Sequence, residues 1–377
     1  MSVMNEAVAG STSIPARSHP IEPTYEGDFV LDGHLVLESG RTLAQPTLHY
    51  AVYGKLNAAR DNAVLICHAL SGSARVGDWW PEVFAPGALL SLDHDFVICV
   101  NLLGSCYGST GPGSVDPETG LVYGPDFPLV SIRDNVCAQA RLLDSLGIRR
   151  LRLVLGGSIG GMQALEWTIY DPARIEHAAI IAVAPLSAMG LALNHLQRQA
   201  IQNDPDWDGG YYLPQRSPRR GLSLARQIGM LSYKSAKLFD ERFSRRPNRN
   251  GEDPWSLDNL GGGLIGGRFD IAGYLDYQGE RFVERFDANS YLAILRTMDT
   301  WDPWNGHAGP QAAFGRIEAR LTFLGISSDW LFPPQSVREF AEAIREAGVD
   351  AEYREMTSSH GHDAFLAEQA ELIRLLQ

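Results

Sequence analysis

Short, continuous runs of apolar residues recur along the chain, separated by stretches with helical periodicity. The clearest runs are Ala63–Cys67, Phe96–Val100, Leu151–Leu155, Ala178–Ala184 and Arg320–Ile326. Runs of this length without alternating polar residues suit strands that are covered on both faces. The helical stretches are Arg133–Leu146, Ile159–Tyr170, Gln335–Ala347 and Ala364–Leu376. Strands that alternate with helices in this way predict an α/β fold with a mostly parallel, doubly wound sheet.

The alternation stops between Ser187 and Asp302, where the pattern is helical. Its helical pieces are Leu191–Gln202, Gly221–Leu238, Phe269–Phe286 and Ser290–Met298. The strand pattern resumes near residue 320, and the last third of the chain has too few strands for a sheet of its own. We therefore expect residues 187–302 to be a helical lid inserted into one α/β core, residues 26–186 and 303–377. Residues 1–25, rich in Ser, Pro and Ala, are expected to be a loose leader.

Composition narrows the class of protein. The 377 residues are 45% hydrophobic and 20% charged, which is typical of a soluble globular protein. The net charge of −13 argues against nucleic-acid binding, which needs a basic surface. No apolar run is long enough to span a bilayer, and no secretory signal is apparent, so we expect a cytoplasmic protein without membrane association. The four cysteines have no C-x-x-C spacing, so neither a disulfide framework nor a metal site is expected.

The run Leu151–Leu155 leads directly into Gly156-Gly157-Ser158-Ile159-Gly160-Gly161, and a helical stretch follows. This is G-x-S-x-G between a strand and a helix, the arrangement of a nucleophile elbow. The sharp turn would hold Ser158 in strained backbone geometry, and the flanking glycines avoid a steric collision. Its Oγ would lie at a helix N-terminus, which favours developing negative charge. Ser158 is the predicted nucleophile; the alternative is an incidental serine in a glycine-rich turn.

A serine nucleophile needs a base and an acid, which follow it in the order acid, then histidine, in this kind of fold. His360 and His362 lie in a loop after the strand-like Ala351–Glu355. His362 is the predicted base, and His360 is expected to be a surface or supporting residue. The predicted acid is Asp329, which directly follows a strand. Asp350 instead precedes a strand and would lie at the opposite end of the sheet.

The oxyanion formed during acyl transfer needs backbone N–H donors. One is expected from Ile159, the residue after the nucleophile, and one from the loop after an early strand. Leu70 is the best-placed donor in the loop that follows Ala63–Cys67. His68 in the same loop is expected to brace it by hydrogen bonding rather than to act in catalysis.

Several segments together resemble the homoserine O-acyltransferases of the α/β-hydrolase superfamily, from about residue 28 to the C-terminus. The matching segments are Cys67–Gly72, Asn101–Pro112, Gly156–Trp167, Arg281–Leu295 and Gly361–Leu366. The resemblance implies acetyl-CoA as acyl donor, L-homoserine as acceptor, and O-acetyl-L-homoserine for methionine biosynthesis as product. It implies no tightly bound cofactor, and a homodimer formed through lid helices.

The same resemblance implies a triad of Ser158, Asp329 and His362, and two substrate-binding residues, Arg226 and Asp363. The charges of the last two suit an amino acid, because a guanidinium can pair with its carboxylate and a carboxylate with its ammonium. The chain departs from the usual family pattern at Ser105, where Gly is frequent, and at Lys234, where Arg is frequent.

Three alternatives remain open at this stage. The donor could be succinyl-CoA, and the acceptor could be serine or another hydroxyl compound. The same triad could also hydrolyse an ester, with water as acceptor. A non-catalytic binding protein of the same fold is a further alternative, which the intact order of Ser, Asp and His disfavours.

The net charge is unevenly distributed along the chain. The expected lid, residues 187–302, holds 15 basic and 15 acidic residues and is therefore neutral, so the charge of −13 lies outside it. The lid includes locally basic stretches at Arg216–Arg226 and Arg242–Arg249. The overall acidity consequently does not argue against an anionic substrate such as an acyl-CoA.

Overall fold

The computed structural model describes residues 20–249, 251, 254, 255 and 267–377. Most of the expected leader, residues 1–19, therefore lies outside the described residues. Tyr25, the last residue of that segment, already belongs to the first strand.

The centre of the fold is an eight-stranded sheet in the order β1-β4-β6-β5-β7-β8-β9-β10. The six strands from β6 to β10 run parallel, while β4 is antiparallel to both of its neighbours. The strands are β1 (Tyr25–Val30), β4 (Thr47–Gly54), β5 (Ala63–Cys67), β6 (Phe96–Val100), β7 (Leu153–Gly157), β8 (His177–Ile181), β9 (Arg320–Ile326) and β10 (Ala351–Met356), and β2 (His34–Val36) pairs with β3 (Thr42–Ala44) in a separate hairpin. The predicted α/β fold with a mostly parallel sheet is confirmed.

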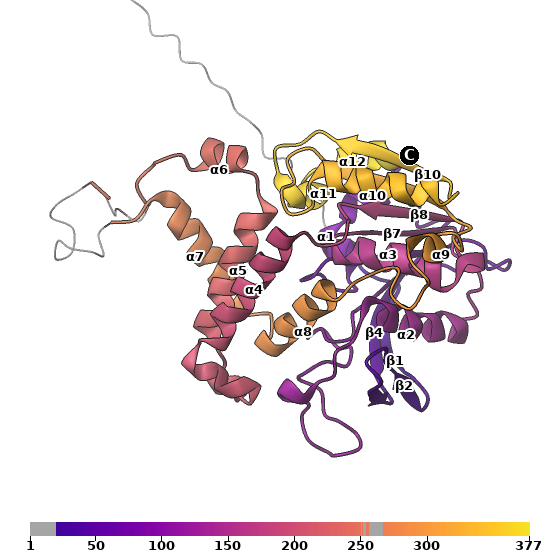
Figure 1. The fold of residues 1–377 in the computed structure, drawn as a ribbon, viewed down its shortest axis with the longest axis horizontal. Helices are drawn as coiled ribbons and strands as arrows, with labels where there is room; N and C mark the ends of the chain where they lie inside the picture. Colours follow the sequence, from indigo (N-terminus) through magenta and orange to yellow (C-terminus); the bar gives the residue numbers. More distant parts are fainter. Residues whose placement is uncertain (1–19, 250, 252–253, 256–266) are drawn as a thin grey trace, which may run out of the picture.

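Helices cover both faces of this sheet (Figure 1). One face packs against α2 (Ile132–Ser145), α3 (Ile159–Tyr170) and α10 (Pro334–Glu346), and the other against α1 (Val76–Trp79), α11 (Ala364–Ala367) and α12 (Gln369–Leu376). The side chains of β5 alternate between the two layers: Leu65 faces the first and Ile66 the second, both fully buried. Complete burial of such a side chain contributes about 1.5–3 kcal/mol, which explains why the buried strands lack polar residues.

The five predicted strands are all present, with shifts at their ends. β7 extends through Gly157 into the elbow, and β8 stops at Ile181 because Ala182 has a φ of +52°. Sequence analysis missed the four strands before Ala63. The longest of these, β4, forms its pairs near the edge of the sheet and mixes buried with partly exposed residues, so it lacks a continuous apolar run.

The described residues between β8 and β9 form helices and turns, and these project to one side of the core (Figure 1). Helix α5 packs between α4 and α7. The helices of this part are α4 (Ala188–Gln202), α5 (Arg219–Tyr233), α6 (Ala236–Arg242), α7 (Asp270–Val283), α8 (Ala288–Asp299) and α9 (Pro310–Phe314). We refer to residues 187–302 as the helical segment. None of the described helices is both long and apolar enough to cross a membrane.

Two predicted helices are each divided in two. The single helix expected over Gly221–Leu238 is wrong: α5 ends before Lys234, which is extended, and α6 starts after Ser235, whose hydroxyl accepts a hydrogen bond from the Leu238 N–H. The helix expected over Ala364–Leu376 is interrupted at Glu368, between α11 and α12. In both places the helical periodicity continues across the break, so periodicity alone could not reveal it.

A group of ionic contacts on the core holds the chain just after the end of the helical segment. The Arg133 guanidinium on α2 pairs with Glu166 on α3 and with Glu38, each at 2.7 Å, and donates to the Asn305 carbonyl at 2.9 Å. Burial raises the pKa of Glu166, while the Arg133 charge acts in the opposite direction. Because removing one partner of a buried pair leaves an uncompensated charge, this contact fixes where the chain re-enters the core.

Candidate active site

Ser158 lies at the turn between β7 and α3, with backbone angles of φ 59° and ψ −130°. This is the left-handed region that non-glycine residues avoid, and the strain persists only where the surrounding structure enforces it. The Ser158 N–H donates to the Ile181 carbonyl at 2.9 Å, and its own carbonyl accepts from the Gly161 and Met162 N–H groups. The Ser158 side chain makes no helix-capping hydrogen bond. Its hydroxyl is therefore not committed to stabilising α3.

The glycines of the elbow allow a close approach of α3 to the end of β5. A Cβ atom on Gly160 would lie 2.1 Å from the Cys67 carbonyl oxygen, and one on Gly156 would lie 2.4 Å from the Gly160 backbone. Both positions are therefore restricted to glycine. Their packing sets Ser158 beside the loop that follows β5.

Asp329 and His362 form a buried pair. Asp329 follows β9, and its Oδ1 accepts hydrogen bonds from the Leu331 and Phe332 N–H groups at 2.9 and 3.0 Å. Its Oδ2 lies 2.6 Å from Nδ1 of His362. The Nε2 atom of His362 is buried, and no described residue hydrogen-bonds to it. The imidazole is thus oriented through one nitrogen, and the other is available.

All three residues lie at the same edge of the sheet. Ser158, Asp329 and His362 follow β7, β9 and β10, which are parallel, so they lie beyond the carboxyl ends of their strands. The Phe365 ring lies between the Ser158 turn and His362. A Cβ atom on Gly157 would be 2.6 Å from this ring, and the centroids of the Phe365 and His362 rings are 5.7 Å apart. Asp350, which sequence analysis rejected as the acid, precedes β10 and lies at the opposite edge, as expected.

Aromatic side chains surround the His362 ring. Phe332 stacks on it at 5.3 Å between centroids, and Tyr233 from α5 lies at 6.0 Å. Burial among these rings lowers the pKa of His362, but the Asp329 and Asp363 carboxylates together outweigh that effect, so the pKa is raised above its ordinary value. Sequence analysis did not identify these aromatic residues, because nothing in their local pattern distinguishes them from core residues.

The loop after β5 has the features expected of an oxyanion-binding loop. Within the described chain, the Leu70 N–H donates no hydrogen bond. Ile159 is the first residue of α3, where N–H groups have no intrahelical acceptor. The buried His68 ring lies 2.8 Å from the Ala69 carbonyl and accepts from the Leu102 N–H at 3.2 Å, and burial lowers the pKa of His68 to about 4. The prediction that His68 braces this loop is confirmed.

Arg226 lies on α5, close to the residues that surround His362. Its guanidinium is over the rings of Tyr233 and Phe282, at 5.5 and 4.8 Å from their centroids. No described carboxylate forms an ion pair with it. Asp363, directly after His362, pairs through Oδ2 with the Lys234 ammonium at 2.8 Å. Lys234 is a residue at this site to which sequence analysis gave no role.

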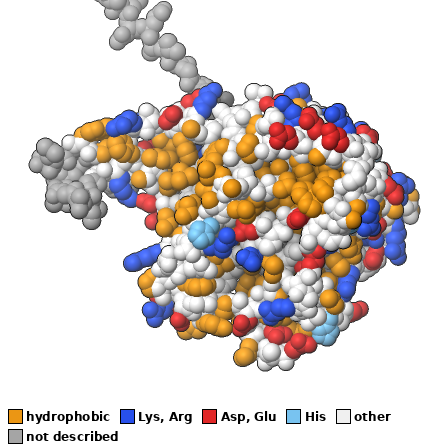
Figure 2. All heavy atoms as spheres, viewed as in Figure 1, with side chains coloured by type: hydrophobic (Ala, Val, Ile, Leu, Met, Phe, Trp, Pro, Cys, Tyr) orange, Lys and Arg blue, Asp and Glu red, His pale blue; other side chains and the backbone are white. Residues whose placement is uncertain are grey.

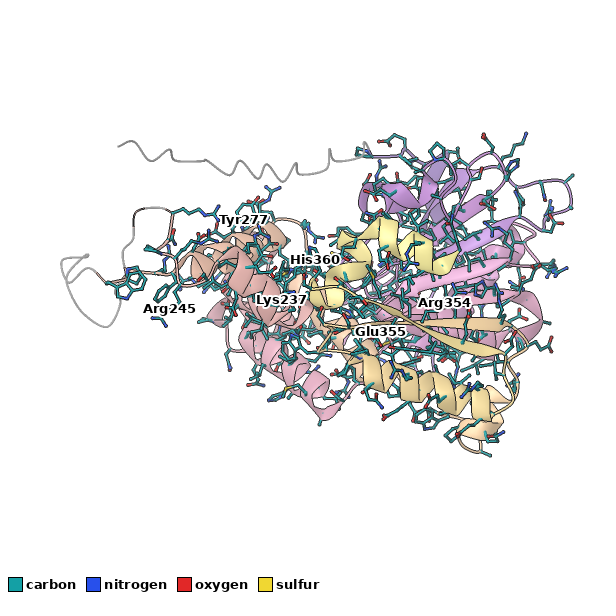
Figure 3. All side chains as sticks on the ribbon, turned by 90° about the horizontal axis from the view of Figure 1, so that it is seen from above. Lys237, Arg245, Tyr277, Arg354, Glu355 and His360 are labelled. Atoms are coloured by element: carbon teal, nitrogen blue, oxygen red, sulfur yellow. The ribbon has the colours of Figure 1, made fainter. Side chains whose placement is uncertain are left out.

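His360 lies outside this group. It contacts Glu368 and is partly exposed. Figure 3 shows it at the edge of the core, beside the helical segment. Its partial exposure agrees with the expectation that His360 is a surface or supporting residue. No group of three or more His, Cys, Asp or Glu residues within the described ranges is arranged to hold a metal ion.

A cavity of about 630 Å³ lies between residues 106–124 and the helical segment, and Arg285 is part of its wall. Nη1 of Arg285 donates to the Ser71 carbonyl at 3.0 Å. Ser71 follows Leu70 directly, so this cavity lies next to the loop after β5.

Comparison with known proteins agrees with this geometry. Residues 62–369 match the family model described as "alpha/beta hydrolase fold". A homoserine O-acetyltransferase of Symbiobacterium thermophilum is 48% identical, with 88% of each chain covered. A homoserine O-succinyltransferase of Azoarcus sp. is 44% identical, covering 99% of this chain and 98% of its own. The chain belongs to the homoserine O-acyltransferase family.

Solved structures show the same fold. The homoserine O-acetyltransferase from Bacillus anthracis superposes with a TM-score of 0.83 at 24% identity, over 95% of this chain and 98% of that one. Esterase E22 superposes with a TM-score of 0.83 at 26% identity, over 94% and 100%. Homoserine O-acyltransferases thus share their architecture with esterases, and the fold does not distinguish transfer from hydrolysis.

Proposed function

We propose that this protein transfers an acetyl group from acetyl-CoA to the hydroxyl of L-homoserine, forming O-acetyl-L-homoserine for methionine biosynthesis. The observation that carries the proposal is the His362 imidazole, which Asp329 holds through Nδ1 while Nε2 has no described partner at the sheet edge that bears Ser158. This is the arrangement by which a histidine activates a serine. The names of the relatives supply the substrate class.

The reaction proceeds in two half-reactions. His362 accepts the Ser158 proton as Oγ attacks the thioester carbonyl, and the tetrahedral intermediate collapses with loss of the CoA thiolate, which takes the proton from His362. His362 then accepts the proton of the homoserine hydroxyl, whose oxygen attacks the acetyl-enzyme. Collapse of the second intermediate releases the ester and returns the proton to Ser158. The N–H groups of Leu70 and Ile159 stabilise both oxyanions.

The acceptor is held by its two charges. Arg226 binds the homoserine carboxylate, since its guanidinium has no carboxylate partner among the described residues and presents a planar pair of donors. Asp363 binds the ammonium group. Both residues lie close to His362. The Arg226 guanidinium contacts the ring of Tyr233, which in turn lies beside the His362 ring, and Asp363 is the next residue after His362 in the chain.

The charges of the site favour acetyl over succinyl as the acyl group. A succinyl group carries an additional carboxylate, which needs a cation of its own. Of the cations that act on this site, Lys234 is already paired with Asp363, and Arg226 serves the acceptor carboxylate. The aromatic groups around His362 suit a small uncharged acyl group instead. Acetyl-CoA is a substrate, and the scheme uses no tightly bound cofactor.

The helical segment acts as a lid, because transfer to homoserine must compete with water. It also provides the surface for a homodimer. Figure 2 shows hydrophobic side chains gathered over this segment, and Leu196 of α4 and Leu224 of α5 line a groove between these helices and are 53% and 49% exposed. We place the reaction in the cytoplasm, where all four cysteines would remain the free thiols seen in the structure.

The test measures CoA release from acetyl-CoA with and without L-homoserine, together with formation of the ester. We expect a burst of CoA release from enzyme alone, and sustained release only with homoserine. Succinyl-CoA at saturating homoserine should react at least tenfold more slowly. Sustained CoA release independent of homoserine would instead indicate a hydrolase, the activity that the likeness to esterase E22 suggests.

A further inference from the structure

The junction between α5 and α6 lies directly on the loops that carry Asp329 and His362. The Lys234 carbonyl accepts a hydrogen bond from Nε1 of Trp330 at 3.1 Å, and Trp330 is the residue after Asp329. The Ser235 hydroxyl donates to the carbonyl of Ser359, in the loop that leads to His362. The break that divides the two helices is therefore a contact between the helical segment and both catalytic loops.

The packing at this junction excludes any side chain on Gly361. This residue has a φ of +74°, and a Cβ atom on it would lie 2.7 Å from the Lys234 carbonyl carbon. A backbone atom cannot move aside as a flexible side chain would. The junction and the His362 loop are thus held in one relative position.

Within this contact, Lys234 makes an ion pair with Asp363. The side chains are 14% and 20% exposed, and Nζ is 2.8 Å from Oδ2. Pairs with this degree of burial are screened less than surface pairs. No described residue forms a hydrogen bond or ion pair with the other oxygen of Asp363, Oδ1. Lys234 of the helical segment therefore occupies Oδ2 of Asp363, whereas Oδ1 has no partner among the described residues.

We propose that Lys234 is a positioning residue for the acceptor: it holds one oxygen of Asp363 so that the other is presented to the ammonium group of the amino-acid substrate. The helical segment then takes part in recognising the acceptor amine, although Lys234 itself does not touch the acceptor. This inference rests on the proposed function, because it requires Asp363 to bind the ammonium group.

The same ion pair acts on the catalytic base. The charged groups with the largest effect on His362 are Asp329 and Asp363, which raise its pKa, and Lys234, which lowers it. Tyr233, Phe332 and Phe365 complete its described surroundings with rings. Loss of the Lys234 charge would therefore raise the pKa of His362 further. Since the base must be neutral, the acidic limb of the rate profile would move to higher pH.

The experiment compares Lys234→Met with Lys234→Arg and with Lys237→Met in the full-length protein. Lys237 lies on α6 near the same junction, but it is 72% exposed and 3.8 Å from Glu241 (Figure 3). Lys237→Met removes one positive charge, as Lys234→Met does, but at a lysine that does not pair with Asp363. Four quantities are measured: the KM for L-homoserine, the KM for acetyl-CoA, the CoA burst above the acidic limb, and the inhibition constant of 4-hydroxybutanoate, which is homoserine without its amine.

For Lys234→Met we expect the KM for homoserine to rise about tenfold, as for loss of one charge-assisted hydrogen bond. The burst and the KM for acetyl-CoA should stay within twofold of the parent protein. The inhibition constant of 4-hydroxybutanoate should also be unchanged, since it has no ammonium group. The acidic limb should move to higher pH, while Lys234→Arg and Lys237→Met should match the parent protein in every respect.

Two results would overturn the inference. An unchanged KM for homoserine would show that Asp363 needs no orientation. An equal loss for homoserine and 4-hydroxybutanoate, or a diminished burst, would show that Lys234 only supports the fold of the catalytic loop. The burst also reports on folding of Lys234→Met, and Lys234→Gln provides a second neutral variant. If the parent protein itself lacks homoserine-dependent CoA release, the proposed function fails, and the inference fails with it.

Discussion

Asp329 acts on His362 by orienting its ring and by raising its pKa. In Asp329→Asn the carboxylate is lost, so we expect kcat to fall roughly 10³- to 10⁴-fold. The residual activity should show an acidic limb at lower pH, because the pKa of His362 falls when the negative charge is removed. A pH profile of kcat/KM tests this. Asp350→Asn, at the opposite edge of the sheet, is the control and should retain full activity.

Gly160 illustrates how much a single methyl group matters at the elbow. A Cβ there would be 2.1 Å from the Cys67 carbonyl, whereas Gly113 has no atom within 4 Å of its Cβ position. We expect Gly160→Ala to lower the free energy of unfolding by about 1–3 kcal/mol and to reduce kcat. Gly113→Ala should change neither. Urea unfolding and the CoA burst measure the two effects, and equal behaviour of the two variants would contradict the packing argument.

At the level of elements, the start of α6 combines a helix cap with a contact to the loop that leads to His362. Ser235 caps α6 by accepting from the Leu238 N–H at 3.0 Å, and it also donates to Ser359 next to the catalytic loop. Ser187 caps α4 in a similar way, accepting from Gly190 at 3.2 Å. Replacing either by Ala should cost about 1 kcal/mol of stability in urea unfolding. Only Ser235→Ala should also lower kcat, and a matching loss in Ser187→Ala would refute a role for this contact in catalysis.

For the whole molecule, the proposed homodimer makes a prediction about mass in solution. Leu224 is 49% exposed in the groove between α4 and α5. An aspartate within a dimer interface would bury an unpaired charge, so Leu224→Asp should shift the protein from dimer to monomer in light scattering after size exclusion. Leu121→Asp, on a core loop where the side chain is 70% exposed, is the control. A dimer that persists in Leu224→Asp would place the interface elsewhere.

The distribution of charge also belongs to this scale. The helical segment is neutral overall, and the net charge of −13 lies in the rest of the chain. The cavity beside the loop after β5 is bounded in part by this neutral segment, with Arg219 and Arg285 in its wall. Glu284 and Asp287 line the same cavity, so its wall carries no net charge although the protein as a whole is acidic.

The sequence by itself determined the buried parallel strands, the elbow at Ser158, and the order in which Asp329 and His362 follow it. Each of these leaves a local signal: a continuous apolar run, a G-x-S-x-G between strand and helix, or a polar residue directly after a strand. Strand β4, which lies next to the edge strand β1, leaves no such signal because it mixes buried with partly exposed residues. The breaks at Lys234 and Glu368 leave none either, because the helical periodicity continues across them.

Only the tertiary structure decided which side chains surround His362 and how Asp363 is held. Tyr233, Phe332 and Phe365 come from three distant parts of the chain, and they meet because parallel strands end at one edge and the helical segment packs on it. The Lys234–Asp363 pair joins residues 129 positions apart. Such contacts depend on how elements pack in space, and a local pattern of residues carries no information about them.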